Sequence, residues 1–113
     1  MMLIIMKIIA AVVTIFTGLY SLLRPTQITG FTGIQATGGR GVTEIRAIFG
    51  GLLIALGVYP LVSSEPTAYV MLGIAYLAIG AVRLISIFLD RSAEKSNWIS
   101  LGVEIVLGTL LIL

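Results

Sequence analysis

The segment that decides the fold is Thr43-Glu44-Ile45-Arg46-Ala47-Ile48-Phe49-Gly50-Gly51-Leu52-Leu53-Ile54-Ala55-Leu56-Gly57-Val58-Tyr59-Pro60. It opens with a carboxylate and a guanidinium two residues apart, and the rest of it is uncharged. A helix of this length and apolarity can cross a bilayer. Small residues recur four apart from Ala47 to Ala55 and seven apart at Gly50 and Gly57, and such spacings let membrane helices approach closely. We therefore expect this segment to be the central helix of a small membrane bundle.

The composition of the whole chain is that of a membrane protein. Of its 113 residues 58% are apolar and only 11% are charged, with a mean hydropathy of +1.15. A soluble domain carries about 25% charged residues, and a chain this short cannot hide so much apolar surface in one core. The apolar runs predict an all-α fold: one integral membrane domain over residues 1–113, an antiparallel bundle of four transmembrane helices at about 3–23, 43–63, 67–89 and 97–113.

The first connection is long and rich in glycine. Arg24-Pro25 should end the first helix, because proline disfavours helix in the residue before it. Residues 24–42 are then expected to form a loop, and Thr43 is expected to cap the second helix. The apolar side chains of this loop, such as Phe31, suggest that it folds back onto the bundle or lies in the membrane interface. A lid over a cavity is the functional alternative.

The residue types exclude several kinds of chemistry. The chain has no cysteine and no histidine, which removes disulfides, thiol nucleophiles and the usual zinc, haem and iron–sulfur ligands. There is no clear nucleophile–base pair either. We therefore expect no enzymatic activity, no metal and no cofactor. The net charge of +2 is not gathered in a basic patch with aromatics, so we expect no nucleic-acid partner.

Four charged residues are expected to approach one another. Four antiparallel spans would bring the loops 24–42 and 90–97 to the same side, with Glu44 and Arg46 just inside it. Arg83 lies seven residues before Asp90, about 10 Å along a helix, and Glu104 lies at a depth of about 9 Å on the last helix. An unpaired charge at such a depth is costly, so membrane charges normally face the interior and pair. We expect Arg83 to pair with Glu104, and Arg46 to pair with Glu44 or Glu104.

This cluster of Glu44, Arg46, Arg83 and Glu104 has two interpretations. It could be a structural clasp that fixes the register of the helices. It could also be a polar pocket for a head group, an anion or a proton, because ionisable residues inside a membrane are functional candidates by default. The two interpretations do not exclude each other.

The pattern Glu44-x-Arg46-Ala47-x-x-Gly50-Gly51 with its apolar continuation resembles a family of small bacterial four-helix integral membrane proteins of unknown function. The layout of the chain is also similar to the DoxX-like group. The resemblance covers the second helix well and the other helices by layout. It implies a four-helix integral membrane protein, and it implies no activity.

The charge distribution predicts an orientation. The side with both longer loops carries Arg24, Arg40, Arg91 and Lys95. The positive-inside rule then places loops 24–42 and 90–97 in the cytoplasm and both termini outside, in the cell membrane of a bacterium or archaeon.

Two hypotheses for the function stay open. The first is a non-enzymatic membrane protein that binds membrane lipids or another lipid-like ligand, or serves as a subunit of a larger membrane complex. The second is a small transporter or channel, proton-linked in one version, with Glu104 or Glu44 as the carboxylate that carries the proton. Four helices leave little room for a pore in one protomer, so a transporter would require a homo-oligomer.

Overall fold

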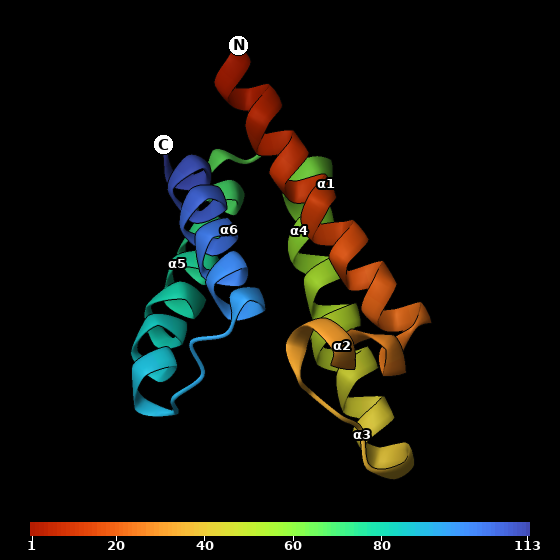
Figure 1. Cartoon of the computed structure of the whole chain (residues 1–113). Coiled ribbons are helices and arrows are strands. Elements are labelled where there is room, and N and C mark those ends of the chain that lie inside the picture. The colour runs from red at the N-terminus through yellow and green to blue at the C-terminus, as the bar shows by residue number, and fades with distance from the viewer. The chain divides into compact units, whose positions relative to one another are not determined.

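The computed structural model describes all residues 1–113, and all its regular structure is helical (Figure 1). In chain order the elements are α1 (Met2–Leu23), the 3₁₀ helix η1 (Pro25–Ile28), α2 (Thr29–Thr32), α3 (Gly38–Glu44), the π-helix η2 (Ile45–Leu52), α4 (Leu53–Ser63), α5 (Pro66–Leu89) and α6 (Lys95–Ile112). Because α3, η2 and α4 run on without a break, four helices are long and apolar enough to cross a membrane: Met2–Leu23, Gly38–Ser63, Pro66–Leu89 and Lys95–Ile112. The predicted all-α class with four such helices is confirmed.

The chain divides into two compact units. The N-terminal unit comprises Ile8–Ser64, and the C-terminal unit comprises Glu65–Leu113 together with Met1–Lys7. Each unit is built around one antiparallel pair of long helices.

Close backbone approach holds the N-terminal unit together. Helix α1 buries a face of small and polar residues at three–four spacing, including Ala11, Thr14 and Gly18. A Cβ atom on Gly18 would lie 2.8 Å from the carbonyl oxygen of Gly50, and one on Gly57 would lie 2.7 Å from that of Ala11. Only glycine permits such contacts. Since residues late in α1 meet residues early in the second long helix, the two run antiparallel (Figure 1).

The π-helix η2 explains which face of the second long helix is buried. Ile45 and Gly50 are both buried, although positions five apart differ by about 140° on an α-helix. Hydrogen bonding from i to i+5 brings them onto one face. Gly57 continues that buried face seven residues on, as its spacing from Gly50 predicts. The other small residues of the segment, Ala47, Gly51 and Ala55, are exposed, so the stripe that they form is not the packing face of this unit.

The predicted extent of the first loop and the predicted cap at Thr43 were wrong. The second long helix begins at Gly38, and Thr43 lies inside it, where its hydroxyl donates a hydrogen bond to the Gly39 carbonyl oxygen at 3.1 Å. Residues 38–44 are helical despite three glycines, and an ion pair between Arg40 and Glu44 spans one turn of α3. Between Pro25 and Thr32 the chain is also helical, so only short stretches of the predicted loop lack regular structure.

The C-terminal unit is a hairpin of two helices that approach each other closely at buried glycines, and we call this contact the glycine seam. Gly73 and Gly80 of α5 are buried, as are Leu101 and Gly108 of α6. A Cβ atom on Gly73 would lie 2.9 Å from the Gly108 carbonyl oxygen. The ring of Phe88 meets that of Trp98 edge-on at 6.1 Å, which closes the hairpin beside its turn. Helices α5 and α6 lie side by side (Figure 1).

Candidate functional site

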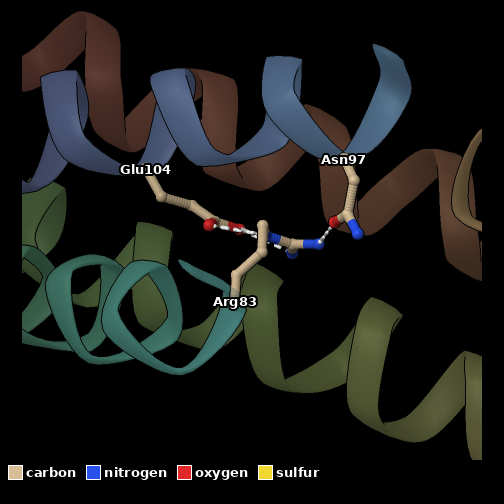
Figure 2. Close-up of polar contacts among 3 residues, drawn as sticks. All are labelled: Arg83, Asn97 and Glu104. Carbon is tan, nitrogen blue, oxygen red and sulfur yellow. Dashed lines mark hydrogen bonds and ion pairs between the residues drawn. The ribbon is translucent and has the colours of Figure 1, made fainter. Parts of the chain in front are cut away.

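The main polar cluster inside the C-terminal unit is centred on Arg83 of α5 and Glu104 of α6 (Figure 2). The Nε atom of Arg83 donates to both carboxylate oxygens of Glu104, at 2.8 and 3.0 Å, and its Nη2 atom donates to Oε2 at 2.7 Å. This two-pronged geometry matches a planar guanidinium to a planar carboxylate, and it is among the stronger hydrogen-bonded arrangements in proteins. The predicted pairing of Arg83 with Glu104 is confirmed.

A third side chain completes the cluster. Asn97, near the start of α6, accepts a hydrogen bond from Nη1 of Arg83 at 2.8 Å (Figure 2). Its amide nitrogen donates to the carbonyl oxygen of Ser92 at 3.0 Å and lies 3.2 Å from the Ser92 hydroxyl. The network therefore links α5 to α6 and also ties down the turn between them.

The ion pair in this network is largely removed from water, and this burial determines what it contributes to stability. The Glu104 side chain is only 10% exposed, and the Arg83 side chain is 30% exposed. Removing a charge from water is expensive, and removing one partner of such a pair leaves the other uncompensated. Since every buried polar side-chain atom has a partner, the cluster is internally satisfied. Its arrangement matches the clasp interpretation, with α5 and α6 held in one register.

The other two predicted cluster residues, Glu44 and Arg46, lie in the N-terminal unit. Glu44 pairs with Arg40, whose Nε atom lies 3.1 Å from Oε1. The expected pairing of Arg46 with Glu44 was wrong, because Glu44 pairs with Arg40 and Arg46 is exposed. The physical reason is helical geometry, because residues four apart face each other whereas residues two apart do not. The alternative pairing of Arg46 with Glu104 would join the two units and stays a prediction.

The carboxylates of the chain are not gathered in one place. No three of them lie together, and the chain has no histidine or cysteine to join them. The cluster around Arg83 therefore offers positioned hydrogen bonds between protein groups.

A groove in the N-terminal unit is the second candidate site, and we call it the N-terminal groove. It has a volume of about 500 Å³ and lies between the second half of α1 and the short helices η1 and α2. Apolar side chains form most of its wall: Val13, Phe16, Tyr20, Ile28 and Phe31. This volume is within the usual range of small-molecule sites.

Most polar side chains along this groove already have a close hydrogen-bond partner. The hydroxyls of Thr17, Ser21 and Thr32 each donate to the backbone carbonyl oxygen four residues earlier, at 2.8, 3.2 and 2.8 Å. The Tyr20 hydroxyl and the Gln27 side-chain oxygen make a long contact of 3.5 Å across the groove. A ligand in the groove would therefore meet mainly apolar atoms.

Several of these residues were not predicted from the sequence. Asn97 lies seven residues before Glu104, hence two helical turns away on the same face, so a search for polar residues on that face could have found it. Arg40 lies four residues before Glu44, which is the standard spacing for a helical ion pair. For the N-terminal groove the sequence indicated only that the apolar loop would fold back onto the bundle or cover a cavity, because the groove's walls depend on the fold of residues 24–37.

Comparison with known proteins gives a family and no activity. A search of curated proteins and a search of solved structures each found no match. The model of one family matches residues 2–113, almost the whole chain, and its description is "Domain of unknown function (DUF4345)". The expected membership in a family of unknown function is thereby confirmed, whereas similarity to the DoxX-like group is not shown. The chain belongs to the DUF4345 family.

Proposed function

We propose that this protein is a non-enzymatic integral membrane protein that binds a lipid-like amphiphile in its N-terminal groove. The observation that carries the proposal is the groove itself, about 500 Å³ in volume and walled by apolar side chains on a helix long enough to span a membrane. A groove in that position has bilayer lipid as its most abundant neighbour.

The chemistry of the groove favours an acyl chain over a polar molecule. The hydroxyls of Thr17, Ser21 and Thr32 are bonded to their own helices, so they offer little to a polar ligand. Burying apolar surface needs no directional partner. Gln27 and the Tyr20 hydroxyl are the polar groups left for the head end of an amphiphile.

The same considerations argue against an enzyme. The chain has no histidine and no cysteine, and no three of its carboxylates lie together. Glu44 is paired with Arg40, and Glu104 is paired with Arg83. Neither carboxylate stands free to act as a general base.

The second candidate is an oligomeric small transporter or a subunit of a membrane complex. The observation in its favour is the exposed stripe of Ala47, Gly51 and Ala55, which would let another helix approach closely. The pairing of both Glu44 and Glu104 argues against a proton-carrying role for either carboxylate.

We further propose a location and an orientation. The protein would lie in the cell membrane of a bacterium or archaeon, with residues 24–42 and 90–97 in the cytoplasm and both termini outside. The excess of arginine and lysine in those two connections supports this orientation.

Native mass spectrometry of the protein purified in a mild detergent tests the proposal. The expected result is a protomer that carries one tightly held lipid or lipid-like molecule. A lipid-free monomer would overturn the proposal. A lipid-free dimer or larger assembly would overturn it in favour of the second candidate.

A further inference from the structure

The net charge of the protein is confined to one unit. The N-terminal unit contains three cationic side chains, Arg24, Arg40 and Arg46, and one carboxylate, Glu44. The C-terminal unit holds four cationic side chains and four carboxylates, so its side-chain charges cancel. The entire formal charge of +2 therefore belongs to the unit with the N-terminal groove.

Two of these three arginines have no carboxylate partner within the N-terminal unit. Glu44 is taken by Arg40, at 3.1 Å. Arg24 and Arg46 are exposed, and neither makes an ion pair within this unit. Both lie in or next to segments expected inside or at the edge of a membrane, where an uncompensated guanidinium favours an anionic partner.

The helix register brings these two arginines to the same end of the unit. Gly57 packs against Ala11, and Gly50 packs against Leu22. In this antiparallel register, Arg46, which precedes Gly50 by four residues, lies toward the segment that follows Leu22. That segment begins with Arg24.

The groove starts at this same end. Arg24 directly precedes η1, and its carbonyl oxygen accepts a hydrogen bond from the backbone N–H of Gln27 at 3.1 Å. Gln27 and Ile28 are both part of the groove wall. The end of the unit where the apolar groove begins thus carries two arginines that have no carboxylate partner within the unit, which matches an amphiphile with an apolar chain and an anionic head.

We propose that the N-terminal groove selects an anionic phospholipid of the surrounding bilayer, with the acyl chain in the groove and the phosphate bound by Arg24 and Arg46. The proposal rests on the proposed function, because it names the ligand class and the head-group residues of the same site. Guanidinium groups bind phosphate oxygens with charge-assisted hydrogen bonds. A zwitterionic lipid carries its own cation next to the phosphate, so it should bind the two arginines less tightly than an anionic lipid.

The test is lipid competition measured by native mass spectrometry. The purified full-length protein is exposed to equal amounts of phosphatidylglycerol and phosphatidylcholine with identical acyl chains. The wild-type protein should retain phosphatidylglycerol preferentially. Arg24→Gln and Arg46→Gln should each lower this preference about tenfold, the loss expected for one charge-assisted contact, while a lipid is still retained.

Two controls separate head-group binding from general effects of charge. Arg91→Gln removes the same charge from an exposed turn of the C-terminal unit and should leave the preference unchanged. Arg24→Lys keeps a cation at the groove and should keep most of the preference. Thermal melting of each variant in the same detergent should show an unchanged fold.

The outcomes distinguish the two proposals. Retention of both lipids without preference by the wild-type protein would overturn the head-group assignment and leave the groove proposal standing. An equal loss of preference in Arg91→Gln would also overturn it, because net charge alone would then explain the selection. Retention of neither lipid would overturn both.

Discussion

Gly73 of α5 and Gly108 of α6 face each other so closely that neither has room for a side chain. A Cβ atom on Gly73 would lie 2.9 Å from the carbonyl oxygen of Gly108, and a Cβ atom on Gly108 would lie 3.1 Å from that of Gly73. The contact is reciprocal and involves backbone atoms, which cannot move aside without separating the helices. It sets the spacing at which Arg83 and Glu104 can meet.

Substitution of this glycine pair should therefore open the C-terminal hairpin. We expect Gly73→Ala to destabilise the protein by about 1–3 kcal/mol, the usual cost of overpacking. Unfolding by denaturing detergent, followed by circular dichroism, measures the change. Gly102→Ala is the matched control on α6: a Cβ atom there meets nothing within 4 Å, so the better helix propensity of alanine should stabilise slightly. Equal effects of the two substitutions would contradict the glycine seam.

The N-terminal unit permits a parallel test. A Cβ atom on Gly57 would lie 2.6 Å from the Ile15 side chain and 2.7 Å from the Ala11 carbonyl oxygen. Gly57→Ala should therefore cost about 1–3 kcal/mol. Gly39→Ala serves as the control, because nothing lies within 4 Å of that position. If Gly57→Ala melted at the wild-type temperature, α1 and α4 could not be packed as described.

The clasp predicts strong coupling between Arg83 and Glu104. Glu104→Ala should destabilise by about 2–3 kcal/mol, because it leaves a partly buried guanidinium without its counter-charge. Asp90→Ala, which removes an exposed carboxylate from the same unit, should change stability little. The double variant Arg83→Ala/Glu104→Ala should be more stable than the sum of the single losses implies, with a coupling of about 1–3 kcal/mol. Strict additivity would show that the two side chains act independently.

The proposed orientation can be measured directly because the chain has no native cysteine. Single cysteines at Ser64 and Ala93, both exposed, report the two sides of the membrane. An impermeant thiol reagent added to intact cells should label Ser64→Cys and should leave Ala93→Cys unlabelled until the cells are opened. The reverse pattern would place residues 24–42 and 90–97 outside.

The sequence predicts the C-terminal unit better than the N-terminal unit. Arg83 and Glu104 could be paired in advance because an isolated charge inside a membrane is so costly that few arrangements are tolerable. Their depths, counted along two helices from one turn, also match, although Glu104 stayed open as a partner for Arg46 as well. Asn97 was not predicted because an uncharged side chain costs less to leave unpaired, so its need for a partner is weaker.

The N-terminal unit depends on backbone conformations that the residue pattern does not reveal. The π-helical turn that puts Ile45 and Gly50 on one face has no simple signature in an apolar run. The groove depends on a compact turn, in which Gly33 adopts a left-handed conformation and the Thr29 hydroxyl donates to the Ile34 carbonyl oxygen at 2.6 Å. Glycine and threonine at such spacings occur equally in open loops.

We assign ligand binding to the N-terminal groove, and we assign to the cluster around Arg83 and Glu104 the role of holding two helices together. One comparison of variants tests these two assignments. Thr17→Trp places an indole in the groove, Thr109→Trp makes the same change at an exposed position on α6, and Glu104→Gln removes the charge from the cluster.

The deciding measurement is the amount of lipid that each folded variant retains in native mass spectrometry. We predict that Thr17→Trp loses the bound lipid, whereas Thr109→Trp and Glu104→Gln keep it. Glu104→Gln should also have a lower melting temperature than the wild-type protein. Retention by Thr17→Trp together with loss by Glu104→Gln would contradict the account and move the ligand to the charge cluster.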